Sequence, residues 1–275
     1  MESQKKLIEK RNWDYLIVLD ACRYDYFKEN YKSYMEGDLK KAISAGYNTG
    51  SWLVNTYSDY YEGIVYVSAN PYINSHGLSL NEQNSDWSYS WKASEHFAKI
   101  IDVWNWGWKE SLNTVPPETV NEAALKARDN YPKSKFIIHY IQPYAPYLIN
   151  GIPKEKQEME EENIRVFFSS IVENPKQVAR WFQRELKRSF PLHPKEMFVR
   201  KGKSALTYAY KKNLQRVLES AKDFSRKNSG KIVITSDHGE FLGEEHKFEH
   251  SPHKGKYPQL REVPWFTVEG WKGSL

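Results

Sequence analysis

An Asp and a His stand side by side after an apolar stretch near the end of the chain, in the run Ile232-Val-Ile-Thr-Ser-Asp237-His238-Gly239. The carboxylate of Asp237 offers a hard oxygen and the imidazole of His238 offers a nitrogen, so the pair can bind one divalent ion. Gly239 allows another stretch of backbone to approach them. Three further histidines follow, at His246, His250 and His253. The segment therefore predicts a metal site with additional imidazoles nearby.

A second carboxylate, Asp20, ends the apolar run from Tyr15 to Leu19. A carboxylate at the carboxyl end of a strand, beside the start of a helix, is well placed to bind a cation. Arg23 follows three residues later, and its guanidinium could hold an anion. A simple helix cap is the alternative role for Asp20.

A hydroxyl group is supplied by the small-residue turn Ser44-Ala-Gly-Tyr-Asn48-Thr49-Gly50-Ser51, which opens an amphipathic pattern. A hydroxyl at the start of a helix lies near free N–H groups and the positive end of the helix dipole, which suits a nucleophile or a bound phosphate-like group. Thr49 is such a hydroxyl. An ordinary N-cap is the alternative role for Thr49, and Asn48 and Ser51 could also fill it.

His139 lies inside the apolar run from Phe136 to Tyr140, which continues into Gln142-Pro-Tyr144-Ala-Pro-Tyr147. A buried imidazole needs hydrogen-bond partners. An active-site role and a hydrogen-bonded position in the core are therefore both open for this histidine.

The elements that must position these groups alternate between strands and helices. Short apolar runs bounded by polar, Gly or Pro residues are typical of buried parallel strands. Six such runs occur, at 15–19, 64–67, 100–104, 136–140, 232–235 and 265–268. Helical spacing of apolar residues follows Pro116 and recurs from Leu206 to Phe224. We therefore expect an α/β fold, a three-layer α/β/α sandwich with a mostly parallel central sheet and its chemistry at the carboxyl ends of the strands.

The middle of the chain has a different pattern. An acidic run, Glu158 to Glu162, precedes a basic and aromatic helical pattern from Val178 to Arg188, and Pro191 and Pro194 are expected to break that pattern. A stretch of about 45 residues is too short for an independent domain. We therefore expect a single domain over 1–275, with a helical insertion or lid at 153–200.

Composition narrows the class of protein. Of the 275 residues, 40% are hydrophobic and 27% are charged, which is typical of a folded domain and excludes a disordered linker. No apolar run approaches the ~20 residues of a membrane helix, and no apolar segment of an export signal follows the charged N-terminus. We therefore expect no membrane span and a cytoplasmic location. The net charge of +5 is too small to predict nucleic-acid binding, although it could favour an anionic substrate.

The four polar segments together resemble the alkaline phosphatase superfamily, in particular its sulfatase-like branch. In that family the first strand ends in a metal-binding Asp, a nucleophile opens a later helix, and an Asp-His-Gly-Glu run completes the metal site. The matching metal-binding residues in this sequence are Asp20, Thr49, Asp237 and His238. The segment from His139 to Tyr147 is similar to the family's His-x-x-x-Pro-His-x-Pro-Tyr, and Arg261-Glu-Val-Pro264 to its late Val-Pro strand.

Three departures from the family pattern refine the expectation. The single cysteine, Cys22, precedes Arg23-Tyr-Asp25 and does not stand in the Cys-x-Pro-x-Arg of sulfatases, which argues against a formylglycine nucleophile. The family's Pro-His is Pro143-Tyr144 here. An Asp-x-x-x-His pair, which two-metal members carry before the Asp-His motif, is missing at a suitable strand end. We therefore expect one tightly bound divalent ion (Zn, Mn, Mg or Ca) in preference to two, with His250 or His253 either assisting a weaker second site or binding the substrate anion.

The resemblance implies a metal-dependent hydrolase of phosphate monoesters or diesters with Thr49 as its nucleophile. The further catalytic candidates are Arg23, His139 and His250, and the candidates for binding the substrate anion are Asn48, Gly50 and His253. Three alternatives stay open: transfer of a phospho-linked head group to a glycan or lipid, sulfate-ester hydrolysis, and a catalytically degenerate protein that binds a glycan or partner. The expected ligand is an anionic ester, such as a phosphorylated or sulfated glycan or lipid head group. Trp104, Trp106 and Trp108 could stack on sugars, with core packing as the alternative use of these rings.

Overall fold

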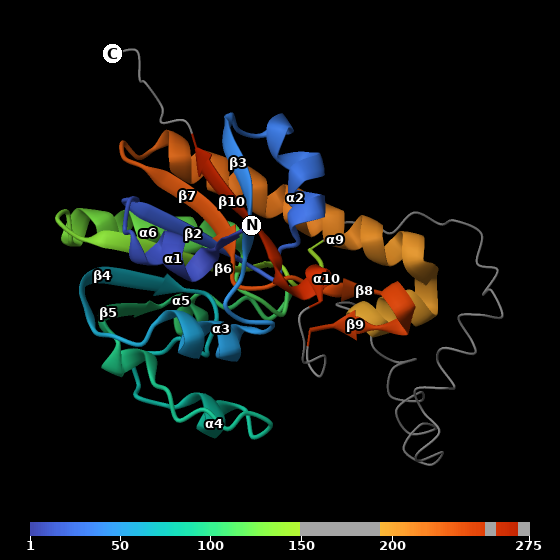
Figure 1. The fold of residues 1–275 in the computed structure, drawn as a ribbon, viewed down its shortest axis with the longest axis horizontal. Helices are drawn as coiled ribbons and strands as arrows, with labels where there is room; N and C mark the ends of the chain where they lie inside the picture. The colour runs from blue at the N-terminus through green and yellow to red at the C-terminus, as the bar shows by residue number, and fades with distance from the viewer. Residues whose placement is uncertain (149–192, 251–256, 269–275) are drawn as a thin grey trace.

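The computed structural model describes residues 1–148, 193–250 and 257–268, whose arrangement is shown in Figure 1. These residues form an eight-stranded sheet with the strand order β1-β3-β10-β7-β2-β6-β4-β5. Five neighbouring strands run parallel: β7 (Ile232–Ser236), β2 (Tyr15–Asp20), β6 (Lys135–Pro143), β4 (Tyr61–Ser68) and β5 (Phe97–Asp102). Strand β10 (Glu262–Val268) is antiparallel to both of its neighbours, β7 and β3 (Gly37–Ile43), and β1 (Glu2–Ser3) lies at the edge. The expected mostly parallel sheet is thus confirmed.

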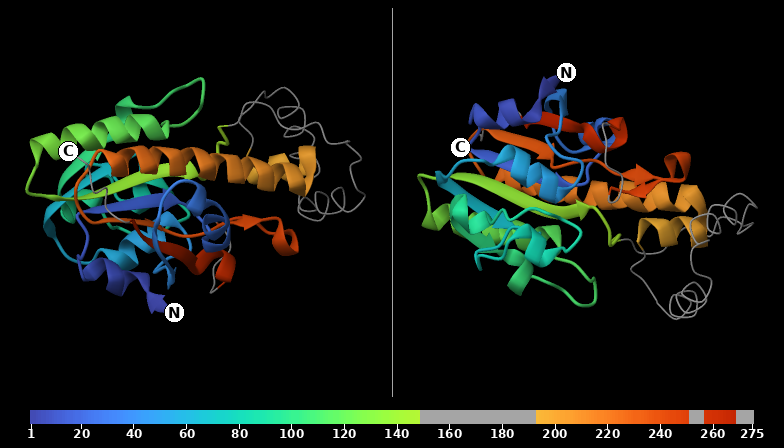
Figure 2. Two further views of the ribbon diagram at one scale, coloured as in Figure 1. Left: turned by 90° about the horizontal axis from the view of Figure 1, so that it is seen from above. Right: turned by 60° about the horizontal axis from the view of Figure 1, so that its bottom comes forward.

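Helices cover both faces of the sheet, as the two views of Figure 2 show. Strand β2 is buried throughout, so its alternate side chains feed two separate cores. Ile17 and Leu19 face the core formed with α2 (Tyr24–Asn30), α6 (Pro117–Asn130) and α9 (Pro194–Arg226). Leu16 and Val18 face the core formed with α1 (Gln4–Glu9) and α3 (Thr49–Thr56). The three-layer α/β/α sandwich is therefore confirmed.

Helix α9 carries the predicted apolar face from Leu206 to Phe224 but begins earlier, at Pro194. Helix α9 starts at Pro194, because the missing N–H at the first helical position has no helical partner to lose. The helical pattern from Val178 to Arg188, which Pro191 and Pro194 are expected to break, lies outside the described residues. Gly202, with a φ of 83°, interrupts the helical backbone in the first part of α9. Most of the predicted insertion, 153–192, lies outside the described residues.

The fifth strand is shifted from its predicted position. Strand β5 covers Phe97–Asp102, and the chain then turns into the short helix α5 (Val103–Trp106). Trp106 and Trp108 are 56% and 43% exposed, so core packing is not the role of these two rings. Strand β3 was not predicted, because its charged and apolar residues alternate in a half-exposed strand instead of forming an apolar run.

The remaining elements are short. They are α4 (Leu80–Gln83), α10 (Pro258–Arg261), the hairpin of β8 (Phe241–Leu242) and β9 (Phe248–Glu249), and 3-10 turns at Tyr31–Ser33, Ala93–Glu95 and Glu244–His246. Within the described ranges, no helix combines the length and the apolar character that crossing a bilayer requires.

Candidate active site

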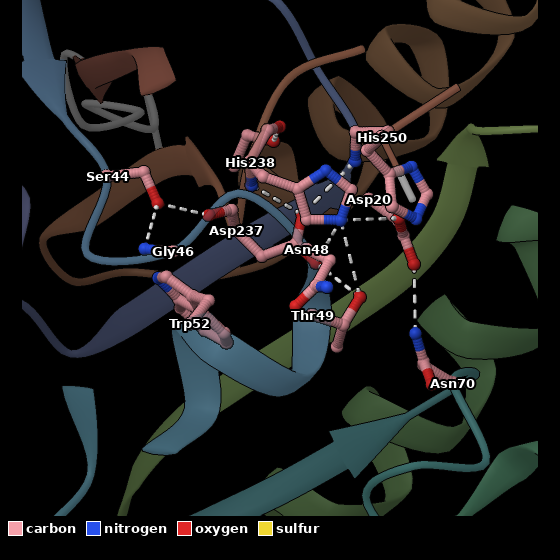
Figure 3. Close-up of polar contacts among 12 residues, drawn as sticks. Asp20, Ser44, Gly46, Asn48, Thr49, Trp52, Asn70, Asp237, His238 and His250 are labelled. Atoms are coloured by element: carbon pink, nitrogen blue, oxygen red, sulfur yellow. Dashed lines mark hydrogen bonds and ion pairs between the residues drawn. The ribbon is translucent and has the colours of Figure 1, made fainter. Parts of the chain in front are cut away.

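The four candidate metal-binding residues meet at the carboxyl end of the sheet, where Figure 3 shows their side chains facing one another. Asp20 ends β2, and Asp237 and His238 follow the neighbouring parallel strand β7. Thr49, at the start of α3, donates a hydrogen bond from Oγ1 to Asp237 Oδ2 at 2.8 Å. His238 Nε2 lies 3.4 Å from Thr49 Oγ1 and 3.7 Å from Asp20 Oδ1. Strand ends and a helix start thus bring two carboxylates, an imidazole and a hydroxyl together.

Backbone groups fix the orientation of Asp237 and His238. The Oδ1 atom of Asp237 accepts hydrogen bonds from the N–H groups of Ala21, at 3.1 Å, and His238, at 2.8 Å. His238 Nδ1 lies 2.8 Å from the carbonyl oxygen of Gly239, so a proton on Nδ1 leaves the lone pair of Nε2 free to face the cluster. A Cβ atom on Gly239 would lie 2.0 Å from the carbonyl oxygen of Gln259. Only glycine fits this close approach.

His139 is a hydrogen-bonded core residue that also faces the cluster. It is fully buried in β6, and its Nδ1 lies 2.9 Å from the hydroxyl of Tyr66. Its Nε2 has no hydrogen-bond partner within the described ranges and lies 3.9 Å from Asp237 Oδ2. Burial lowers the pKa of His139 to about 4, which keeps the ring neutral at pH 7. A neutral ring that donates from Nδ1 to Tyr66 presents the lone pair of Nε2 to the cluster.

The buried charges of this cluster fit a divalent ion. Asp20, His139 and Asp237 each place one ligand atom within 4.8 Å of the others. Burial raises the pKa of Asp20 well above its usual value, and the neighbouring charge of Asp237 raises it further. Among the described residues, neither carboxylate forms an ion pair with a lysine or an arginine. Two buried carboxylates need a compensating cation, and carboxylate oxygens with imidazole nitrogens suit Zn or Mn.

The first turn of α3 presents Thr49 to the cluster because Asn48 caps the helix. The Oδ1 atom of Asn48 accepts a hydrogen bond from the N–H of Ser51 at 2.8 Å. The N-cap role thus belongs to Asn48, and the Thr49 hydroxyl is available for Asp237. Thr49 and Gly50 occupy the first turn, where N–H groups have no partner within the helix.

Arg23 points into a network behind the loop that follows β7. Its guanidinium donates to Asp25 at 2.6 and 3.0 Å, to Glu244, and to the carbonyl oxygen of Glu240 at 3.3 Å. Burial opposes the charge of Arg23, but Asp25 and Glu244 outweigh it, and the pKa of Arg23 is raised. Within the described part of the chain, none of these bonds reaches Thr49. The structure therefore places Arg23 where it supports the loop.

His250 lies beside the cluster. The rings of His250 and His238 have centroids 4.2 Å apart, and the ring of Tyr144 packs against His250 with centroids 5.3 Å apart. Tyr144 therefore lines this side of the site. His246 is exposed in a 3-10 turn, and His253 lies outside the described residues.

Two further polar residues belong to the site: Asn70, which was not predicted from the sequence, and Glu240, which the resemblance matches to the last residue of the family's Asp-His-Gly-Glu run. Asn70, two residues beyond β4, donates a hydrogen bond from Nδ2 to Asp20 Oδ2 at 2.9 Å. Its signal was its place after an apolar run, the same signal that identified Asp20. Glu240 is fully buried, and neither of its carboxylate oxygens has a hydrogen-bond partner among the described residues. Burial raises the pKa of Glu240 well above its usual value.

Comparison with known proteins gives matches in fold. No family model and no curated protein sequence matches the chain. The integral membrane protein lipooligosaccharide phosphoethanolamine transferase A from Neisseria meningitidis aligns with a TM-score of 0.54 and 13% identity, over 92% of this chain and 47% of that one. Its soluble domain aligns with a TM-score of 0.56 and 12% identity, over 92% and 75% of the two chains. The C-terminal periplasmic domain of EcEptC from Escherichia coli, in complex with Zn, aligns with a TM-score of 0.50 and 11% identity, over 94% and 72%.

The chain thus spans about half the length of the full transferase. Identities of 11 to 13% carry no residue role from one protein to another, but each alignment covers at least 92% of this chain. Both the topology and the strand-end position of the polar cluster agree with the motif resemblance. The structural neighbours are members of the alkaline phosphatase superfamily, and this chain has their fold.

Proposed function

We propose that this chain is a metal-dependent enzyme that hydrolyses phosphate esters through a covalent intermediate on Thr49. The hydrogen bond from Thr49 Oγ1 to Asp237 Oδ2 carries the proposal, because it places a hydroxyl at a helix start beside buried carboxylates. A hydroxyl so oriented directs its lone pairs away from the carboxylate, toward a bound phosphoryl group. The substrate would be an anionic ester.

Asp20, Asp237 and His238 would hold the divalent ion, with His139 Nε2 and Thr49 Oγ1 as further ligand candidates. A divalent ion, when bound, supplies positive charge that favours an ionised hydroxyl and balances the charge of the phosphoryl oxygens.

The residues of the chain would act in a fixed order. The N–H groups of the first turn of α3 bind a phosphoryl oxygen at the positive end of the helix dipole. The Oγ1 atom of Thr49 passes its proton to the Asp237 carboxylate to which it is hydrogen-bonded and attacks phosphorus, while the bond from phosphorus to the leaving oxygen breaks and the departing alcohol takes a proton from His250. Water then gives one proton back to His250 and its oxygen attacks the phosphothreonine. The phosphorus–Oγ1 bond breaks, and Thr49 regains its proton from Asp237. The position of His250 beside His238 supports its role as the proton donor.

Transfer to an alcohol acceptor is the second candidate reaction. The two Neisseria structures that share the fold are named as phosphoethanolamine transferases, which favours testing an acceptor other than water. The two reactions share every step up to the intermediate. The location in the cytoplasm stays a prediction, and the similar E. coli structure is a periplasmic domain.

Substitution of Thr49 tests the proposal directly. Thr49→Ala should abolish release of p-nitrophenolate from p-nitrophenyl phosphate and its diester, and Thr49→Ser should restore part of it. The matched control is Thr56→Ala on the same helix, since the buried hydroxyl of Thr56 has no hydrogen-bond partner among the described residues. Mass spectrometry should find phosphate on the Thr49 peptide after an acid quench. Full activity of Thr49→Ala would place the nucleophile elsewhere, and an added alcohol that yields a new ester would identify transfer.

A further inference from the structure

An aromatic ring, Trp87, packs on the residue that follows the candidate nucleophile, and a second ring, Tyr72, packs on Trp87. A Cβ atom on Gly50 would lie 2.6 Å from Cε3 and 2.7 Å from Cζ3 of Trp87, so the six-membered ring of this indole covers the first turn of α3. The ring of Tyr72 packs against Trp87 with centroids 4.4 Å apart. Both side chains are partly exposed. We call Tyr72 and Trp87 the aromatic wall.

The aromatic wall belongs to a well-anchored excursion between β4 and β5, which lies below α3 in the view of Figure 1 and carries α4. Ile73 and Leu80 are fully buried in the core of the α3 face. The indole N–H of Trp91 donates to the carbonyl oxygen of Tyr57 at 2.9 Å, and the N–H of Leu80 donates to the carbonyl oxygen of Trp91 at 3.0 Å. These contacts fix the excursion on the rigid part of the domain.

Asn70 links the aromatic wall to the metal-binding cluster. Its Nδ2 donates to Asp20 Oδ2 at 2.9 Å, and its Oδ1 accepts from the N–H of Tyr72 at 3.0 Å. Burial raises the pKa of Tyr144 well above its usual value, and Tyr72 is among the neighbours that add to this rise. Through Asn70, the backbone of Tyr72 is thus tied to the carboxylate at the end of β2.

The aromatic wall can contact only those substrate groups that lie on its own side of the phosphorus atom. In an in-line displacement the leaving group departs opposite the nucleophile. Trp87 covers the residue next to Thr49 on the same helical turn, which is the nucleophile's own side. A leaving group is therefore directed away from the wall. A substituent that stays on phosphorus lies to the side of the reaction axis and can reach it.

We propose that the aromatic wall binds the substituent retained on phosphorus, and that the substrate is a phosphodiester whose retained group is a ring with an apolar face, such as a sugar. This inference rests on the proposed function and narrows it from phosphate esters to diesters. Rigid, partly exposed aromatic side chains present large flat apolar surfaces with a polar edge. The hydroxyl of Tyr72, which accepts from Asn84 Nδ2 at 3.2 Å, supplies such an edge.

Three substrates with the same leaving group test the inference: bis(p-nitrophenyl) phosphate, which retains an aryl ring, methyl p-nitrophenyl phosphate, which retains a methyl group, and p-nitrophenyl phosphate. The wild-type protein should prefer the first to the second in kcat/KM. Trp87→Ala should reduce this preference about tenfold and leave kcat/KM for p-nitrophenyl phosphate within about twofold of wild type. Trp87→Phe, which keeps a ring, should retain most of the preference. Trp106→Ala, at an exposed ring outside the wall, is the matched control and should change nothing.

Failure of the inference and failure of the proposed function give different results. Equal losses on all three substrates in Trp87→Ala, with an unchanged melting temperature, would overturn the aromatic wall as a subsite while cleavage itself stands. Absence of cleavage by the metal-loaded wild-type protein would overturn the proposed function. A fourth substrate, p-nitrophenyl phosphorylcholine, tests the chemistry of the retained group. If Trp87→Ala lowers kcat/KM more for this substrate than for bis(p-nitrophenyl) phosphate, the assignment of a ring as the retained group is overturned. A quaternary ammonium group would then be the better occupant of the aromatic wall.

Discussion

Replacing Asp20 by Asn should shift the stability of the protein in opposite directions with and without metal. The carboxylates of Asp20 and Asp237 are buried together, with ligand atoms within 4.8 Å. Without a cation, they repel each other. The substitution removes one charge and keeps the shape, and an amide oxygen can still accept the hydrogen bond from Asn70. The metal-free variant should therefore be more stable than the metal-free wild type.

The separation of the charges sets the size of the effect. Two unit charges 4.8 Å apart repel by about 3 kcal/mol at an effective dielectric constant of 20. Because the raised pKa of Asp20 relieves part of this repulsion by protonation, we expect a gain of about 1 to 2 kcal/mol. That corresponds to an increase in Tm of roughly 2 to 6 °C for a domain of this size. In the presence of metal the order of the two stabilities reverses. Binding at a metal concentration about 100 times Kd stabilises the wild-type protein by about 2.7 kcal/mol, whereas the variant lacks one metal ligand.

Thermal unfolding in chelator and in a Zn or Mn titration measures both effects. Asp102→Asn is the matched control, because Asp102 also ends a strand but accepts from Ser75 and Trp104, outside the cluster. This control should lose a little stability and keep the full metal response. A metal-free Asp20→Asn protein less stable than wild type, or one with an unchanged metal response, would refute the assignment of Asp20 as a buried metal ligand.

Three further substitutions test how the site is supported. Gly239→Ala should destabilise the protein by about 3 kcal/mol in chemical denaturation and abolish metal binding, because its Cβ would meet the carbonyl oxygen of Gln259 at 2.0 Å. Arg23→Met should lower stability by about 1 to 2 kcal/mol through the ion pair with the partly exposed Glu244; a rise in KM without a loss of stability would instead place the guanidinium on the substrate. Asn70→Ala should weaken metal binding about tenfold in calorimetry, because it releases the carboxylate at the end of β2; unchanged affinity would contradict this positioning role.

The sequence predicted the residues whose positions follow from strand ends and helix starts. Asp20 and Asp237 end neighbouring parallel strands, so their side chains had to emerge at the same edge of the sheet. The position of Thr49 followed from one further prediction, namely that the small-residue turn begins a helix. The shift of β5 was mispredicted because it concerns an element boundary, where an apolar run alone does not fix the first or last residue.

The residues that escaped prediction depend on contacts distant in sequence. Trp87 reaches the first turn of α3 only because Ile73 and Leu80 anchor its excursion in the core of that face. Arg23 follows Asp20 by three residues, and this closeness in sequence favoured the interpretation that Arg23 binds a substrate anion. Its direction is set instead by Asp25 and Glu244, and Glu244 lies 221 residues away. No local pattern contains that information.

The distribution of buried polar groups gives an independent reason to place function at this edge of the sheet. The central strands are mostly apolar, yet Asp20 and His139 within them, and Asp237 and Glu240 just after β7, are all at most 3% exposed. Among the described residues, the carboxylate oxygens of Glu240 have no hydrogen-bond partner, and such a buried carboxyl group destabilises a fold unless a ligand or a proton balances it. Such departures from apolar burial concentrate at functional sites, because only there does a bound group restore the balance. A cation between the two Asp side chains would supply that balance for Asp20 and Asp237, and a proton would supply it for Glu240.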